Sequence, residues 1–199
     1  MHGATERLSP YTNAPLDLEG RGIRLVELQS SSSSDTIRCH LRSYALPPDG
    51  PSYIALSYQW GPCERYANIE LNGMPFTVGR SLWTFLHQMR LHRVFKTFWI
   101  DAICIDQANV EERNHQVGMM RHIYLNAASV SIWLGEVEED TLVGEAMKIM
   151  APRNLRSGQT LDNIAHWKRW TTREIEAFQA FCEHKYWSRV WIIQEVALA

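Results

Sequence analysis

The alternation of apolar and polar residues predicts how the first part of this chain folds. Residues 1–20 show little periodicity and are rich in Pro, Asn and Gly, so we expect an irregular arm. Residues 22–28 alternate apolar and polar side chains, as a half-buried strand does, and residues 36–44 alternate again. The serine run at 30–34 predicts a loop. These segments together predict a β-hairpin.

Two further strand-like segments precede a change of period. Residues 53–58 form a short apolar run typical of a central strand, and residues 69–78 consist of two strand-like halves around Asn72-Gly73. Asn-Gly predicts a hairpin because both residues tolerate positive φ. The apolar positions after Ser81 fall at helical spacing, so we expect Ser81 to cap a helix.

The middle of the chain alternates strand and helix patterns. Residues 97–105 are almost continuously apolar, which predicts a strand covered on both faces. Asn109 is placed to cap the next helix, with Glu112 at its third position. The expected apolar stripe of that helix is Val117, Met120, Tyr124 and Ala127. Residues 129–134 predict another buried strand, which closes at Gly135.

The last quarter predicts helices joined by a polar loop. We expect helices at residues 141–150 and 172–183, with a loop at 152–162 between them. Thr171 and Glu174 have capping-box spacing, and Ser188 is placed to cap a final helix. The whole pattern predicts an α/β fold in which helices cover both faces of a parallel sheet and the early hairpins add strands to it.

Composition narrows the class of protein. The chain has 199 residues, a net charge of −2 and 45% hydrophobic residues, which suits one folded domain. Lys and Arg are scattered rather than clustered, so we expect no nucleic-acid partner. The four cysteines form no C-x-x-C pair, and no run approaches the roughly 20 apolar residues of a membrane span. We expect a soluble protein of a reducing, cytoplasmic compartment.

Polar residues at the predicted strand ends are the first candidates for chemistry, because ligands of open parallel sheets bind beyond the carboxyl ends of the strands. Ser57, Tyr58 and Trp60 close one such strand. Asp101 lies within the next apolar run, where a buried charge needs a partner. It either forms a structural ion pair, with Arg113 or Arg189 as the partner, or contacts a ligand.

The closing segment and one cysteine are the other candidates. Residues 187–195 predict two helical turns, in which Trp191 and Glu195 lie one turn apart on the same face. They either stack and stabilise a flat polar ligand, or are an ordinary core aromatic and a solvated glutamate. Cys104 is a candidate nucleophile with His115 or His122 as base, although a lone cysteine in an apolar run is typical of a core. Zinc-binding and phosphate-loop motifs are absent from the sequence, so we expect no metal site.

Three long blocks resemble the heterokaryon incompatibility (HET) domain of filamentous fungi. They are residues 53–61 (YIALSYQWG), residues 99–107 (WIDAICIDQ) with Glu112-Arg113, Gln116, Met120 and Tyr124 after them, and residues 187–195 (WSRVWIIQE). Residues 130–135 (VSIWLG) fit the same pattern, and Asp106 stands where the family usually has Asn. The chain is identified as a member of this family, with an irregular arm at 1–20 and a single HET domain at 21–199.

The resemblance implies an effector domain of non-self recognition and regulated cell death. It also implies that the domain self-associates and is activated by a sensor domain or a partner protein. HET domains are more distantly similar to TIR domains, which implies a TIR-like central parallel sheet flanked by helices. In catalytic TIR domains a glutamate serves NAD⁺ cleavage. Ser57-Tyr58 and Trp191-x-x-x-Glu195 match the corresponding TIR elements.

This likeness implies roles for individual residues. Glu195 is the catalytic carboxylate, and NAD⁺ is the substrate, with no metal or further cofactor. The implied substrate-binding residues are Ser57, Tyr58, Trp60, Asp101, Arg189 and Trp191. Trp191 stacks on a ring and Arg189 meets a phosphate in this hypothesis. The rival hypothesis is a non-catalytic module in which the same residues form a homotypic interface.

Overall fold

The computed structural model describes residues 9–30, 36–61, 66–138, 140–150, 170–192 and 195. The chain divides into two compact units, of which unit 1 is Met1–Gly135 with Val190–Ala199 and unit 2 is Glu136–Arg189. The single domain expected over residues 21–199 stays a prediction, because two compact units can belong to one larger domain. The loop expected at 152–162 lies outside the described residues.

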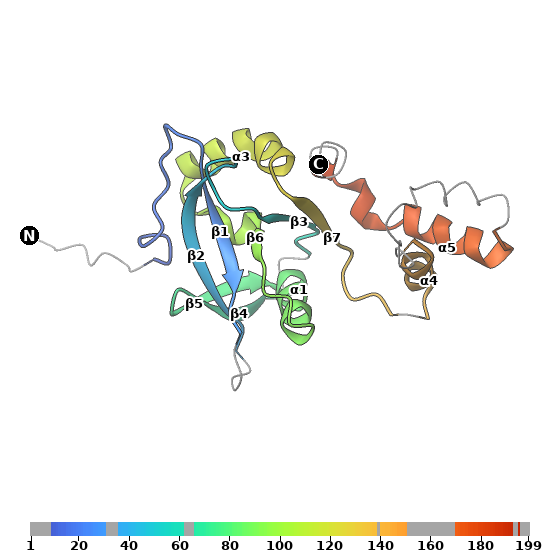
Figure 1. Ribbon diagram of the computed structural model, residues 1–199. Helices are drawn as coiled ribbons and strands as arrows, with labels where there is room; N and C mark the ends of the chain where they lie inside the picture. The colour runs from blue at the N-terminus through green and yellow to red at the C-terminus, as the bar shows by residue number, and fades with distance from the viewer. Residues whose placement is uncertain are drawn as a thin grey trace, which may run out of the picture. The chain divides into compact units, whose positions relative to one another are not determined.

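Unit 1 contains a seven-stranded sheet with the strand order β5-β4-β2-β1-β6-β3-β7 (Figure 1). The strands are β1 Gly22–Leu28, β2 Arg38–Ala45, β3 Ile54–Tyr58, β4 Tyr66–Leu71, β5 Met74–Gly79, β6 Thr97–Trp99 and β7 Ser129–Trp133. Strand β3 runs parallel to β6 on one side and to β7 on the other, and β2 runs parallel to β4. The remaining pairs are antiparallel. The α/β class is confirmed, but the sheet is mixed rather than parallel throughout.

Both predicted hairpins are present. Strands β1 and β2 pair antiparallel along their whole length, from Gly22 opposite Ala45 to Leu28 opposite Cys39. Strands β4 and β5 are joined at Asn72 and Gly73, which adopt φ values of 51° and 80°. The Asn-Gly signal succeeds because a type I′ hairpin turn requires positive φ at both central positions.

The apolar run at 97–105 folds differently from the prediction. Only Thr97–Trp99 is a strand, and Asp101–Cys104 forms a short helix, α2. Asp101 is therefore half-buried at the start of a helix and not inside a strand. The prediction was wrong because a short, fully buried apolar run has the same pattern in a strand and in a helix.

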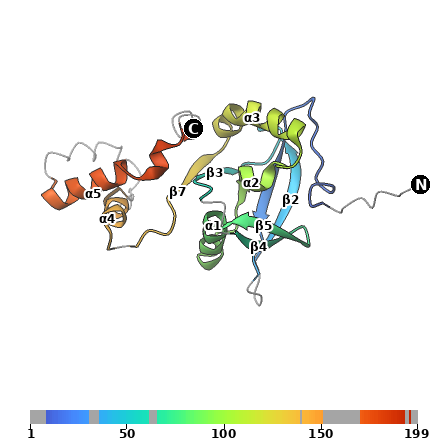
Figure 2. The same ribbon diagram turned by 180° about the vertical axis from the view of Figure 1, so that it is seen from behind.

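Two longer helices cover opposite faces of the sheet. Phe98 of β6 makes an edge-on ring contact with Phe85 of α1 (Arg80–Leu91), whereas Trp99, the next residue, contacts Tyr124 of α3 (Val110–Leu125). Successive side chains of a strand point to opposite faces, so α1 and α3 lie on opposite sides of β6. Seen from behind, α2 lies between them (Figure 2).

Three details of these elements correct the sequence analysis. Helix α1 begins one residue before Ser81, directly after β5, with Gly79 as its N-cap. In α3 the Asn109 cap is confirmed, because the Glu112 amide donates to its side chain, but Val117 is exposed. Strand β7 is half-exposed rather than buried, because it is the last strand in the order of the sheet.

Unit 2 contains α4 (Leu142–Met150), α5 (Thr172–Cys182) and the 3₁₀ helix η2 (Lys185–Ser188). The predicted capping box of Thr171 and Glu174 is confirmed in both directions. Among the described residues, no helix combines the length and apolar character needed to cross a bilayer.

Candidate functional site

The closing segment is not one continuous helix. Arg189, which follows η2, has an extended conformation, and Ser188 donates its hydroxyl to the Lys185 carbonyl within η2. The prediction of a two-turn helix at 187–195 with Ser188 as its cap was therefore wrong. The one-turn spacing at the end is confirmed, because the amide of Glu195 donates to the carbonyl of Trp191 with an N–O distance of 3.2 Å.

The side chains of this turn differ sharply in exposure. Trp191 is 44% exposed, whereas Glu195 is only 1% exposed. Glu195 is therefore not a solvated surface residue, and Trp191 is not a core aromatic. An ionised carboxylate is costly to bury unless it is hydrogen-bonded, so the surroundings of Glu195 must supply donors.

Ser57 is one of those donors. It lies on β3, is fully buried, and donates its hydroxyl to Oε2 of Glu195 in a short hydrogen bond. Because Ser57 is the penultimate residue of β3, this bond places the carboxylate near the carboxyl end of a strand with a parallel neighbour on each side. Two predicted site residues that are 138 positions apart thus meet.

A second pair of predicted site residues meets near the same strand end. The indole Nε1 of Trp60, just beyond β3, donates to Oδ2 of Asp101, just beyond β6, over 3.0 Å. The Asp101 carbonyl also accepts from the side chain of Gln107. Parallel pairing of β3 with β6 aligns the ends of the two strands and makes the Trp60–Asp101 bond possible.

Tyr58 and Arg189 are placed differently. Tyr58 is buried, and the alternation along β3 directs it to the face opposite Ser57. Arg189 belongs to unit 2, where its guanidinium lies 5.4 Å from the ring centroid of Tyr186. The substrate-binding roles of both residues stay predictions.

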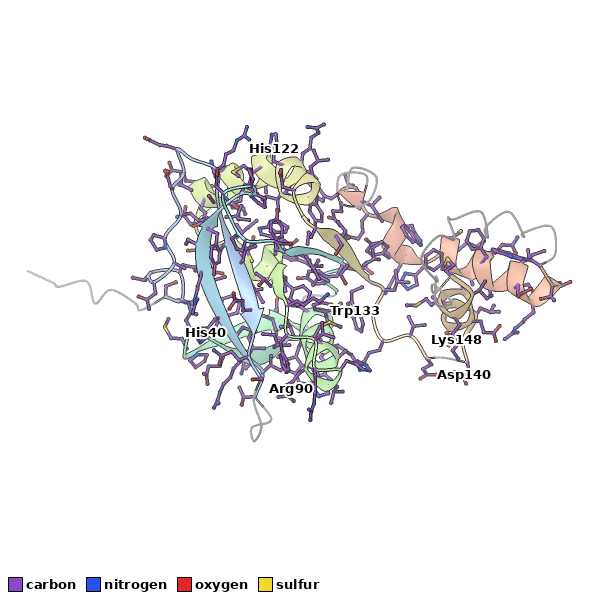
Figure 3. All side chains as sticks on the ribbon, viewed as in Figure 1. His40, Arg90, His122, Trp133, Asp140 and Lys148 are labelled. Atoms are coloured by element: carbon purple, nitrogen blue, oxygen red, sulfur yellow. The ribbon has the colours of Figure 1, made fainter. Side chains whose placement is uncertain are left out.

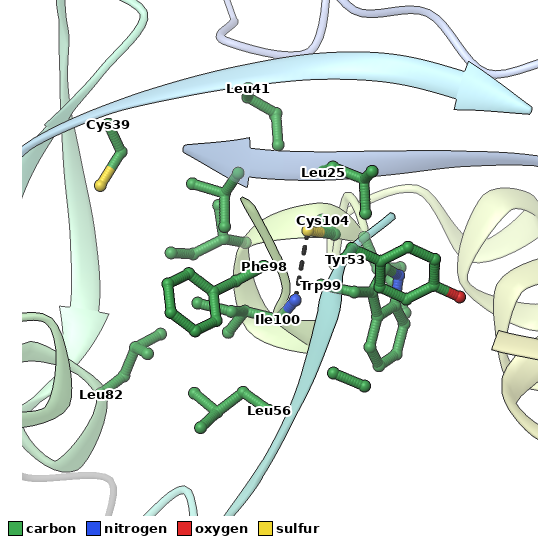
Figure 4. Close-up of a cluster of buried hydrophobic side chains, with 14 of the residues drawn as sticks. Leu25, Cys39, Leu41, Tyr53, Leu56, Leu82, Phe98, Trp99, Ile100 and Cys104 are labelled. Atoms are coloured by element: carbon green, nitrogen blue, oxygen red, sulfur yellow. Dashed lines mark hydrogen bonds between the residues drawn. The ribbon is translucent and has the colours of Figure 1, made fainter. Parts of the chain in front are cut away.

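Cys104 is a core residue. It is fully buried within an apolar cluster, and its sulfur accepts a hydrogen bond from the Ile100 amide (Figure 4). Burial raises the pKa of the Cys104 thiol to about 12, so the nucleophilic thiolate is disfavoured at neutral pH. One suggested base, His122, lies on α3 at the outside of unit 1 (Figure 3). The geometry favours the structural role for this cysteine.

Sequence reasoning missed a buried ion pair. Arg24 of β1 forms two parallel hydrogen bonds to the carboxylate of Glu112 of α3, at 2.5 and 3.0 Å. Arg24 also donates to the carbonyls of Ala14 and Cys104, and its guanidinium lies 4.7 Å from the centroid of the Tyr11 ring. The sequence contained one signal for it: in a strand Arg24 shares a face with Val26 and Leu28, and a charge among apolar residues needs a partner.

This ion pair joins segments that are distant in sequence. Oε1 of Glu112 accepts from the Asp106 amide over 2.6 Å, which fixes the connection between α2 and α3. Tyr11 donates its hydroxyl to the Ile105 carbonyl, so the described end of the N-terminal arm packs onto the same connection. Arg24 and Glu112 thereby support the backbone that carries Asp101. In the described part of the chain, no group of three or more His, Cys, Asp or Glu side chains could hold a metal ion.

Comparison with known proteins identifies the class to which this fold and site belong. The family model described as "Heterokaryon incompatibility protein (HET)" matches residues 53–195, so the chain belongs to the HET family. A curated relative is the Neurospora crassa protein named "Heterokaryon incompatibility protein 6, OR allele", which is 31% identical over 231 aligned positions. That alignment covers 96% of this chain and 34% of the relative, so the chain spans about a third of the relative's length. No solved structure matches.

Proposed function

We propose that this HET domain is an effector of fungal non-self recognition and regulated cell death that cleaves NAD⁺ and releases nicotinamide when it self-associates. The observation that carries the proposal is the Glu195 carboxylate, held by Ser57 at the carboxyl end of β3. The family membership and the name of the Neurospora crassa relative support the cell-death setting. The parallel trio β6, β3 and β7 is the part of the sheet that supports a distant likeness to TIR domains. We place the protein in the cytoplasm.

The chemistry requires a carboxylate more than any other group. Cleavage of the bond between nicotinamide and ribose builds positive, oxocarbenium-like charge on the ribose. A carboxylate fixed beside that charge stabilises it, and can orient the attacking water. Glu195 supplies this carboxylate in our proposal, and Trp191 supplies an exposed indole one turn away for stacking on a ring.

The burial of Glu195 gives the proposal a regulatory step. A side chain that is 1% exposed cannot touch a substrate, so we propose that the buried arrangement of Glu195 is a resting state. The closing segment must move before the carboxylate meets a ribose. Self-association that engages the exposed Val190 and Trp191 is a direct way to move it. In this account Ser57 holds the resting state.

Nicotinamide release from NAD⁺ by the purified chain tests the activity. We expect turnover when the chain is clustered through a fused inducible dimerisation tag, and loss of turnover in Glu195→Gln. Glu176→Gln, at an exposed position of α5, is the matched control and should behave as the parent chain. The absence of turnover in the clustered chain would overturn the activity. Unchanged turnover in Glu195→Gln would remove Glu195 from the mechanism.

Ser57→Ala tests the resting state. Removing the hydroxyl deletes a donor to Glu195, so we expect turnover to rise in the unclustered chain and to change little in the clustered chain. A fall in kcat of the clustered chain with KM unchanged would instead make Ser57 a positioning residue for the carboxylate. Circular dichroism of the variant verifies that the fold is retained.

The second candidate function is a non-catalytic homotypic interaction module. It is favoured by one observation, the exposure of Val190 at 85% beside the half-exposed Trp191. Exposed tryptophan is enriched at the energetic centres of protein interfaces. Glu195→Gln distinguishes the two functions. Light scattering should show that this variant still self-associates in either case, but its cell-death signalling survives only if the domain is a non-catalytic module. Trp191→Ala should abolish self-association and signalling in such a module.

A further inference from the structure

The charges of unit 1 are strongly segregated along the chain. Between Glu70 and Asp101 the sequence contains no aspartate or glutamate. The same stretch contains six basic side chains, which are Arg80, His87, Arg90, His92, Arg93 and Lys96. The three arginines and the lysine among them are three to ten positions apart, so a search for clusters of Lys and Arg does not find them. The absence of carboxylates over 30 positions makes the stretch basic in a chain whose net charge is −2.

The structure gathers these residues on α1 and on the loop that follows it. Arg80, Trp83, His87 and Arg90 recur at intervals of three and four residues, so they form one stripe along α1. The buried apolar residues of α1, Leu82, Phe85 and Leu86, lie on the other side of the helix, toward the sheet. Figure 3 shows Arg90 at the outer end of unit 1. We call residues 90–96 the basic tip.

Apolar side chains protrude between the cations of the basic tip. Leu91 is 59% exposed and Phe95 is 44% exposed, and His92, Arg93 and Lys96 around them are exposed as well. Strand pairing places one carboxylate near the basic tip: Glu27 of β1 lies opposite Thr97, the residue that directly follows the tip. Exposed aliphatic and aromatic side chains among cations are the combination that inserts into the interface of an anionic bilayer.

The backbone of the basic tip carries a further signal at Arg93. The Val94 amide donates to the Met89 carbonyl and the Arg93 amide donates to the Arg90 carbonyl, which is a Schellman ending of α1. Arg93 occupies its left-handed position with φ of 55°. Glycine is favoured there because a side chain is strained at positive φ. An arginine at this position adds a cation at the cost of backbone strain, and such strain concentrates at functional sites.

We propose that the basic tip is a docking surface for an anionic phospholipid bilayer. The cations approach the headgroups while Leu91 and Phe95 enter the interface. Nucleic acid is the less suitable partner, because single strands bind to free aromatic faces. The Trp83 ring is already stacked on His87 and covered by the Arg80 guanidinium, at 4.8 and 4.4 Å between centres. Phe85 is buried, so Phe95 is the one phenylalanine or tryptophan ring of residues 80–96 with a free face, and a single ring is no platform for successive bases. An exposed leucine contributes nothing to base stacking.

Flotation of the purified chain with lipid vesicles tests the proposal without any need for catalytic activity. We expect binding to vesicles of phosphatidylcholine with phosphatidylserine, no binding to pure phosphatidylcholine, and weaker binding as salt rises. Arg93→Gly should weaken the partition coefficient about fivefold, as expected for one cation near an anionic surface. The same variant should melt at a higher temperature than the parent, because glycine relieves the strain at positive φ.

Three further variants separate the contributions. Arg93→Lys keeps the charge and should bind as the parent chain does. The double variant Leu91→Ser with Phe95→Ser keeps the charge and should bind more weakly. Arg121→Gln, which removes an exposed cation on α3, is the matched control and should leave binding unchanged.

The opposite results are equally clear. Equal binding to neutral vesicles, no binding to either kind, or an equal loss in Arg121→Gln would overturn the proposal. Binding of a fluorescent single-stranded oligonucleotide without binding of vesicles would also overturn it, and would reassign the surface to nucleic acid.

Discussion

Arg24 and Glu112 show how single residues hold unit 1 together, because each is nearly inaccessible to water and each satisfies the other. Their side chains also bind three backbone groups, from the arm, α2 and the turn after it. A buried ion pair contributes little net stability by itself, but removal of one partner leaves an uncompensated charge.

Glu112→Ala should therefore lower the free energy of unfolding by about 3–5 kcal/mol. The measurement is urea denaturation followed by circular dichroism. Glu70→Ala is the control, because the Glu70–Arg38 pair is half-exposed and should contribute at most about 1 kcal/mol. Equal losses in the two variants would contradict the structural role of the buried pair.

The buried thiols give a prediction of accessibility and of pH dependence. Burial raises the pKa of both Cys39 and Cys104 to about 12, from an ordinary value of 9.0. The folded state holds these protons more tightly, so the stabilisation is complete below pH 9 and is lost as the pH rises toward 12.

The exposure of the thiols predicts their reactivity. In a Cys63→Ser background, iodoacetamide at pH 8 should modify the exposed Cys182 and should modify Cys39 and Cys104 only after unfolding. Rapid alkylation of Cys104 in the folded chain would contradict its role as a core residue and would support the hypothesis that it is a nucleophile.

At the scale of elements, the β4–β5 turn does more than reverse the chain. The side chain of Asn72 accepts from the Leu41 amide and donates to the Leu41 carbonyl, at 2.9 and 3.0 Å. With these two bonds the Asn72 side chain pairs with the backbone of β2 as a residue of a neighbouring strand would. The bonds lie next to the short parallel pairing of β2 with β4. The turn type was predictable from Asn72-Gly73, but this second role was not, because it depends on which strand the hairpin meets.

Asn72→Gly and Asn72→Ala separate these two roles. Glycine retains the turn but loses both side-chain bonds, so it should cost about 1–3 kcal/mol in the free energy of unfolding. Alanine also forces a Cβ into positive φ, which adds about 1 kcal/mol. Thermal unfolding of the two variants measures which is less stable, and we expect it to be the alanine variant. A more stable alanine variant would show that the turn conformation is not under strain.

The elements also show why some sequence predictions failed. The hairpins, α3 and the capping box of α5 were predictable because local turn and cap chemistry determines them. The run at 97–105 was not, because an apolar pattern does not distinguish a buried strand from a buried helix. The exposure of β7 was not predictable either, since strand order alone makes it the last strand.

At the scale of the whole molecule, the order of the units along the chain is informative. Unit 2 is inserted in the sequence between Gly135, just after β7, and Val190, where the chain returns to unit 1. The main apolar cluster, from Ala14 to Tyr124, consists entirely of unit 1 residues. The folding of unit 1 should therefore not depend on unit 2.

Replacement of residues 136–189 by a flexible Gly-Ser linker of about 20 residues tests this independence. We expect the shortened chain to unfold in one cooperative transition in urea, with the far-ultraviolet signal of the remaining elements. Removal of residues 190–199 from the same chain should lower its stability, because Ser57 loses its partner Glu195. A shortened chain without a cooperative transition would mean that the two units fold together.

The sequence by itself determined the local features of this protein and its family. Turn residues, helix caps and alternating patterns act over a few positions, and the family motifs are written in the order of the residues. Only the tertiary structure decided which candidates meet. Ser57 with Glu195, Trp60 with Asp101 and Arg24 with Glu112 are pairs separated by 41 to 138 positions. Strand order and burial bring them together, and neither is encoded in any local pattern.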